Sequence, residues 1–159
     1  MNTFLPYPSF SASARSLDNR RLWKQVVECK QLLNILVKQS VYYKIRKLRV
    51  VDKSYWGFGA WSNHPALLMW APNPKSLVWY AMACIQECKL RGIAKGTKIF
   101  SDIAEIGAVF GYNGLPKWCG NKDFHLSHQS NLLRKNKEFY FAKFGDVPNN
   151  LEYIWPIRR

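Results

Sequence analysis

Residues 17–38, with the sequence LDNRRLWKQVVECKQLLNILVK, carry the strongest helical pattern in the chain. Their apolar positions Leu22, Val26, Cys29, Leu33 and Leu36 advance by steps of four, three, four and three residues. That spacing places all five on one side of a helix. We therefore expect a helix over about 17–38 with one face buried in a hydrophobic core.

A polar stripe runs beside this apolar stripe on the same helix. The spacing places Glu28 on the polar stripe, one position from Cys29 and therefore at the edge of the buried face. As a partly desolvated carboxylate among cations, Glu28 is a candidate functional residue. The alternative interpretation is that Glu28 only forms an ion pair with a neighbouring Arg or Lys. The stripe consists of Arg21, Lys24, Gln25, Glu28 and Gln31.

The rest of the chain predicts further helices and no repeat. We expect a short helix from His64-Pro65 to about residue 70 and a long one from Asn73-Pro74 to Arg91, where Gly92 ends it. A shorter helix is expected over 101–110, and another from residue 127 or 128 to 144. Residues 41–51 suit either a short hairpin or an irregular basic loop, and the tail 153–156 is expected to be extended and docked on the body. The pattern predicts an all-α fold: a compact single domain, residues 1–159, of three longer helices plus short ones.

Charge and aromatic content point to a polyanionic partner. The 159 residues include 24 Lys and Arg against 10 Asp and Glu, a net charge of +14, and 15% aromatic residues. Residues 20–53 alone hold ten basic and two acidic residues. A solvated face is the alternative explanation of such a run, but nothing local balances it. Basic charge with abundant rings favours nucleic acid, because bases stack on aromatic side chains.

Several function classes are disfavoured by what the sequence lacks. It has no apolar run long enough to span a membrane and no signal peptide, so we expect a cytoplasmic protein with four reduced cysteines. Gly57-Phe58-Gly59 lacks the lysine of a phosphate-binding loop. The few acids do not cluster as a two-metal nuclease requires. Without a CxxC pair, we expect no metal and no cofactor at the one candidate set, which is Cys84, Cys88, Cys119, His125 and His128.

The three histidines leave two interpretations open. His125 and His128 lie three residues apart near the expected start of a helix, where they either pack and cap or contact a phosphate. His64 precedes Pro65, where capping and function are equally compatible with the sequence.

Taken in order, several blocks resemble a known family. Residues 17–28 (LDNRRLWKQVVE) resemble the first helix of the pyrimidine-dimer glycosylases of the phage endonuclease V family. Residues 64–70 (HPALLMW) and 85–93 (IQECKLRGI) are similar to the next two blocks, and 124–135 (FHLSHQSNLLRK) to the last helix. The opening TFLPYP at 3–8 is similar to bacterial and phage members. The resemblance spans most of the chain, and its specificity lies in the order and spacing of the blocks.

The resemblance implies a compact all-α, endonuclease V-like fold and a DNA glycosylase with AP-lyase activity. It implies an N-terminal α-amine as nucleophile and places Glu28 on the catalytic glutamate. Because Asn2 is bulky, we expect Met1 to be retained and to carry the reactive amine. An α-amine has a pKa of about 7.7–8, so much of it is neutral and nucleophilic at physiological pH, and nearby positive charge favours that form.

The expected partner is double-stranded DNA with a damaged or modified pyrimidine, most simply a UV dimer, bound by a monomer in a bacterial or phage-infected cell. One alternative is a glycosylase for another modified pyrimidine, since Val27 stands where the phage enzyme has a basic residue. The other is a DNA-binding protein without catalysis. The expected catalytic residues are Met1 and Glu28. The expected DNA-binding residues are Asn2, Arg20, Arg21, Lys24, Gln25, Arg46, Lys47, His64, His125, His128 and Arg134.

Overall fold

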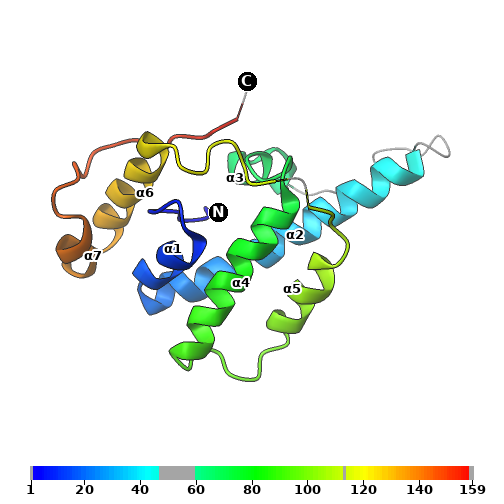
Figure 1. Cartoon of the computed structure of the whole chain (residues 1–159), viewed down its shortest axis with the longest axis horizontal. Coiled ribbons are helices and arrows are strands. Elements are labelled where there is room, and N and C mark those ends of the chain that lie inside the picture. Colours follow the sequence, from blue (N-terminus) through cyan, green and yellow to red (C-terminus); the bar gives the residue numbers. More distant parts are fainter. Residues whose placement is uncertain (1, 47–59, 113, 158–159) are drawn as a thin grey trace.

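The computed structural model describes residues 2–46, 60–112 and 114–157, and within these ranges every regular element is a helix (Figure 1). The three longer helices are α2, α4 and α6, which confirms the predicted all-α fold. None of the helices in these ranges is long and apolar enough to cross a membrane. The elements are α1 Phe10–Ser16, α2 Asn19–Arg46, η2 Ala60–Asn63, α3 Pro65–Leu68, α4 Pro74–Leu90, α5 Ile99–Gly107, α6 Lys122–Lys135 and α7 Lys137–Phe144.

The core forms where α4 packs against α1, α2 and α5 (Figure 1). The predicted apolar stripe of α2 is buried throughout, with Leu22, Val26, Cys29 and Leu33 fully inaccessible. Burial of this aliphatic surface is the main stabilising contribution, at roughly 25 cal/mol per Å² removed from water. The matching stripe of α4 is also buried and consists of Leu77, Ala81, Cys84, Ile85 and Cys88.

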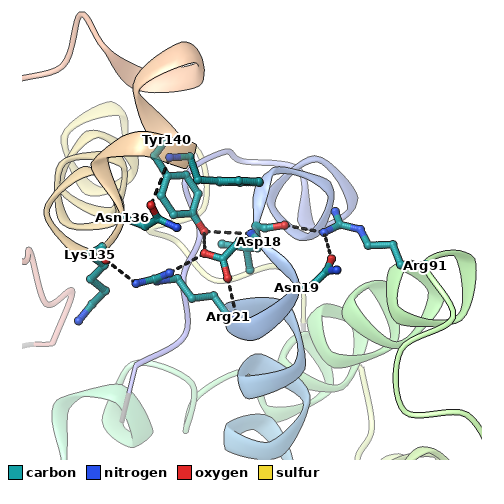
Figure 2. Close-up of polar contacts among 9 residues, drawn as sticks. Asp18, Asn19, Arg21, Arg91, Lys135, Asn136 and Tyr140 are labelled. Carbon is teal, nitrogen blue, oxygen red and sulfur yellow. Dashed lines mark hydrogen bonds and ion pairs between the residues drawn. The ribbon is translucent and has the colours of Figure 1, made fainter.

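Polar contacts tie the end of α4 to the turn before α2. The Arg91 guanidinium donates from Nη1 to the Leu17 carbonyl at 2.7 Å and to Asn19 Oδ1 at 3.1 Å (Figure 2). Its Nη2 donates to the Arg15 carbonyl at 2.9 Å. Glu87, one turn back on α4, orients the side chain through Arg91 Nε at 2.7 Å. These contacts fix the angle at which the chain enters α2, and therefore the direction of its polar stripe.

The predicted helix at 101–110 is displaced to Ile99–Gly107, and two other predictions were wrong by more. Helix α2 continues to Arg46, so neither the hairpin nor the irregular loop expected over 41–51 is present over 41–46, and residues 47–59 lie outside the described ranges. The last predicted helix is two helices. The first begins at Lys122 because the Asn121 side chain accepts a hydrogen bond from the Phe124 N–H at 3.0 Å. Asn136 separates it from α7 and caps α7 by accepting from the Phe139 N–H at 3.2 Å.

The extended C-terminal tail docks on α6 as expected. The Leu151 N–H donates to Ser130 Oγ at 3.0 Å, and the Ile154 N–H donates to Ser127 Oγ at 3.3 Å. Both serines are buried and lie one turn apart on α6. This docking carries Tyr153 against the N-terminal segment, where its ring lies 6.4 Å from that of Phe4.

Candidate active site

The N-terminal segment lies alongside α2 and is bound to it through main-chain groups. The Asn2 N–H donates to Glu28 Oε2 at 3.2 Å, and the Asn2 carbonyl accepts from Gln25 Nε2 at 3.4 Å. The Phe4 N–H donates to Gln25 Oε1 at 2.7 Å. Two side chains one helical turn apart thus fix the backbone of residues 2–4 over the first third of α2.

Gln25 is fully buried and is itself held by Tyr80 of α4. The Tyr80 hydroxyl lies 3.0 Å from Gln25 Oε1 and 2.6 Å from the Phe4 carbonyl. Burial raises the pKa of Tyr80 well above its ordinary value, so this hydroxyl keeps its proton. Gln25 was expected to bind DNA, but the structure places its amide in the interior, where it organises the N-terminal segment.

His125 and His128 hold the next residue of the segment from the opposite side. His125 Nδ1 lies 2.8 Å from the Leu5 carbonyl while its Nε2 accepts from the Gly120 N–H at 3.0 Å, a pattern that requires a neutral ring with the proton on Nδ1. His128 Nδ1 accepts from the Leu5 N–H at 3.3 Å. Burial lowers the pKa of both rings, that of His128 to about 3.

This arrangement corrects the alternative in which the two rings contact a phosphate. Both side chains are buried, 4% exposed for His125 and 0% for His128, and both are neutral. They lie past the start of α6, because that helix begins several residues earlier than predicted. Their role in the structure is to bind the main chain of Leu5 and so to orient the residues before it.

A pocket of about 440 Å³ opens where the N-terminal segment meets α2. Glu28 is only 6% exposed and lies in its wall, with Lys24 Nζ 3.7 Å from Glu28 Oε1. The Lys24 side chain is largely exposed, so its ammonium remains available to a ligand. Four cations and one carboxylate give the pocket a positive balance that attracts anions. Its lining consists of Asn2, Phe4, Arg20, Arg21, Lys24, Glu28, Lys135 and Tyr153.

Arg21 reaches this pocket from a fixed position. Its Nη1 lies 2.5 Å from Asp18 Oδ2, its Nη2 donates to the Lys135 carbonyl at 2.8 Å, and its guanidinium lies over the Tyr140 ring (Figure 2). The Tyr140 hydroxyl donates to the same Asp18 oxygen at 2.8 Å and accepts from the Asp18 N–H at 3.0 Å. Burial raises the pKa of Asp18, but hydrogen bonds from Arg21 and Tyr140 outweigh burial and hold it below its ordinary value. Asp18 is therefore ionised and keeps Arg21 in place.

Arg134 and His64 have structural partners. Arg134 donates to the Asn149 carbonyl at 2.5 Å and the Leu151 carbonyl at 2.7 Å, which fastens the tail to α6. His64 caps α3 by accepting the Ala66 N–H at 3.1 Å. Neither residue lines the pocket around Glu28.

The remaining expected site residues divide into two groups. Asn2, Arg20, Arg21 and Lys24, which were expected to bind DNA, line one pocket with Glu28, which was expected to be catalytic. Arg46 ends α2, and Met1 and Lys47 lie outside the described residues. The site residues that the sequence did not single out are Phe4, Tyr80, Lys135 and Tyr153.

Metal-ligating side chains do not gather in the described ranges. No three His, Cys, Asp or Glu residues there are grouped in a way that can hold a metal ion. All four cysteines are free, and burial raises the pKa of Cys88 to about 11. The pocket itself presents one carboxylate, four cations, and the Asn2 and Tyr153 side chains.

The chain matches one known protein family. The sequence model of pyrimidine dimer DNA glycosylase matches residues 1–101, which include the N-terminal segment, Gln25 and Glu28. Comparison with curated proteins gives no match, and neither does comparison with solved structures.

Proposed function

The chain belongs to the pyrimidine dimer DNA glycosylase family, and we propose that it removes UV-damaged pyrimidines through its N-terminal α-amine and then cleaves the strand as an AP lyase. The observation that carries this proposal is the hydrogen bond from the Asn2 N–H to Glu28 Oε2 at 3.2 Å. One peptide unit separates the Asn2 nitrogen from the α-amine of Met1, so covalent geometry keeps that amine within a few ångströms of the Asn2 nitrogen.

In the proposed reaction, the neutral amine attacks C1′ of the damaged nucleotide. A bond forms between the amine nitrogen and C1′, and the electron pair of the C1′–N1 bond leaves with the base, which takes a proton from water. The amine nitrogen gives up a proton, the C1′–O4′ bond opens with protonation of O4′, and a Schiff base remains. Glu28 stabilises the positive charge that develops on the sugar during base departure.

The lyase step uses the same carboxylate as a base. The protonated Schiff base acidifies C2′, Glu28 removes a C2′ proton, and the C3′–O3′ bond breaks with the phosphate as leaving group. Water then hydrolyses the imine and releases the amine. The buried position of Glu28 beside the main-chain N–H of Asn2 suits both tasks, because the carboxylate is fixed and only slightly hydrated.

The cations around the pocket supply the proposed DNA contacts. Arg20 and Lys24 are exposed, Arg21 is braced by Asp18, and all three line the same pocket as Glu28. Phosphates of the strand bound across these cations bring a flipped nucleotide to the carboxylate. Arg46, the last residue of α2, and Lys47 are further proposed DNA contacts because of their positive charge.

Borohydride trapping tests this proposal. The full chain is incubated with three duplexes, bearing one cyclobutane thymine dimer, one abasic site or no lesion, and borohydride then reduces any Schiff base to a stable link. We expect adducts with the first two duplexes and a peptide map that places DNA on the N-terminal residue. An adduct with the abasic duplex alone assigns the enzyme to another modified pyrimidine. Tight binding without any adduct overturns the catalytic proposal.

A further inference from the structure

Polar atoms without partners gather at the pocket. Throughout the described ranges, four buried side-chain nitrogen or oxygen atoms have no hydrogen-bond partner, and three of them belong to Asn2 and Tyr153. They are both amide atoms of Asn2 and the Tyr153 hydroxyl, which lie close enough to influence each other but do not form a hydrogen bond of ordinary geometry. A buried polar group without a partner costs about 1–3 kcal/mol, so such groups in a native protein call for an explanation. Because both residues line the pocket, a ligand that fills it is the natural partner.

The two side chains lie close together in the wall of the pocket. The main chain of Asn2 is fixed at both ends, by Glu28 at its N–H and by Gln25 at its carbonyl. The Tyr153 ring packs against His128, with ring centroids 5.6 Å apart. The terminal torsion of an asparagine is broad, so the Asn2 amide turns toward an incoming group at little cost.

Tyr153 retains its proton under physiological conditions. Burial raises its pKa to about 12, although the nearby Asn2 amide acts in the opposite direction. The hydroxyl and the Asn2 amide nitrogen therefore present two neutral donors beside a carboxylate. The cations that also line the pocket are suited to bind negatively charged phosphate groups. Neutral donors are suited instead to hydrogen-bond an oxygen that is uncharged in the substrate and gains negative charge during the reaction.

We infer that Asn2 Nδ2 and the Tyr153 hydroxyl donate hydrogen bonds to O2 of the departing 2-oxopyrimidine and so stabilise it as a leaving group. This inference rests on the proposed function. When the C1′–N1 bond breaks, its electron pair enters the base and is delocalised onto O2, the exocyclic oxygen next to N1. Hydrogen bonds donated to this oxygen are stronger in the transition state, where O2 gains negative charge, than in the intact nucleotide. Only such a difference accelerates cleavage of the C1′–N1 bond.

The test separates base excision from strand cleavage. Asn2→Leu removes both amide atoms with little change in size, and its bulk keeps the retention of Met1 unchanged, which intact mass verifies. Tyr153→Phe removes only the hydroxyl, and Tyr112→Phe, at an exposed ring, is the matched control. Single-turnover excision is measured on the dimer duplex and Schiff-base trapping on a preformed abasic duplex, which has no base to release.

We expect excision to fall on the order of 10- to 100-fold in Asn2→Leu and less in Tyr153→Phe. The rate of trapping on abasic DNA should fall by less than about threefold in both variants. The decisive quantity is therefore the ratio of the excision rate on the dimer duplex to the trapping rate on the abasic duplex. Equal losses on both duplexes, or no loss on either, overturn the inference. Absence of any adduct from the unaltered chain on either duplex refutes instead the proposed function on which it rests.

Discussion

The main-chain nitrogen of Asn2 and the carboxylate of Glu28 lie 3.2 Å apart although 26 positions separate them in the chain. The contact uses Oε2 of the carboxylate and leaves Oε1 directed toward Lys24, 3.7 Å away. Because the donor is a backbone N–H, the contact does not depend on the side chain at position 2. The N-terminal segment is thereby aligned with the carboxylate, while the Asn2 side chain lines the pocket beside Tyr153.

Glu28→Gln should abolish most of the activity. The amide retains the shape of the side chain and accepts the Asn2 N–H, but it carries no charge and removes no proton. We expect incision of dimer-containing DNA to fall at least 100-fold while DNA affinity is maintained or rises. Gel assays of incision and binding measure both quantities, with Glu138→Gln, at an exposed position on α7, as the control. Incision at the normal rate by Glu28→Gln would remove the proposed role.

Gln25→Leu should lower both stability and catalysis. The substitution leaves the Phe4 N–H and the Tyr80 hydroxyl without their shared acceptor in the interior. We expect the free energy of unfolding to fall by about 2–4 kcal/mol. Chemical denaturation measures this loss, with Gln31→Leu, exposed on the same helix, as the control. A loss no larger than that of the control would contradict the buried role of Gln25.

Arg20→Ala and Lys24→Ala should make DNA binding less sensitive to salt. Each lost phosphate contact reduces the slope of log Kobs against log salt concentration by about 0.9. Fluorescence anisotropy over a range of salt concentrations gives the slope. Lys98→Ala is the charge-matched control, because Lys98 pairs with Asp102 at 2.5 Å on α5, outside the pocket. Identical slopes for all three variants would place the DNA elsewhere on the surface.

His128 should make the fold sensitive to acid. Its folded-state pKa of about 3 lies below the ordinary 6.5, so between these values the unfolded chain binds more protons than the folded one. The stabilising contribution of the neutral ring is therefore complete above pH 6.5 and is lost as the pH falls toward 3. The expected slope from this group is about 1.4 kcal/mol per pH unit. For His128→Asn, the free energy of unfolding measured by denaturation should fall less steeply as the pH is lowered over the same range. A fall as steep as that of the unaltered protein would exclude His128 as a cause of the acid sensitivity.

Tyr140→Phe should loosen the support of Arg21. The hydroxyl accepts the Asp18 N–H and donates to the Asp18 carboxylate, and phenylalanine does neither. We expect a loss of about 1–2 kcal/mol in unfolding free energy with the ring packing retained. Thermal denaturation measures it, with Tyr112→Phe as the exposed control. If both variants unfold alike, the contact between Tyr140 and Asp18 is not stabilising.

The sequence predicted the helices with clear apolar stripes and missed those without them. Helices α2 and α4 follow from periodic Leu, Val, Ala and Cys positions, all of which are buried. Helix α1 was not predicted as a separate element, because FSASARS has no such stripe and begins instead with a Ser9 cap that accepts the Ala12 N–H at 3.2 Å. The β-branched and aromatic residues near position 42 have low helix propensity, which disguised the last turns of α2.

The part of the site on α2 was predictable from its local pattern. Glu28, Lys24 and Arg21 follow from the polar stripe of α2, and Arg20 follows from its charge. The structural roles of His125 and His128 depend on contacts with Leu5 over about 120 positions, and no local pattern encodes such contacts. Their spacing suggested a phosphate site only because the helix was expected to begin near residue 127. The actual start at Lys122 turns both rings toward the interior.

The binding of Leu5 by α6 also determines when the site is complete during protein synthesis. Residues 2–5 leave the ribosome long before the imidazoles that fix Leu5, which are translated 120 or more positions later. Helices α2 and α4 are available to pack together well before that point. Residues 2–5 thus reach their final positions long after they are translated, and the proposed nucleophile stays unassembled until α6 has emerged.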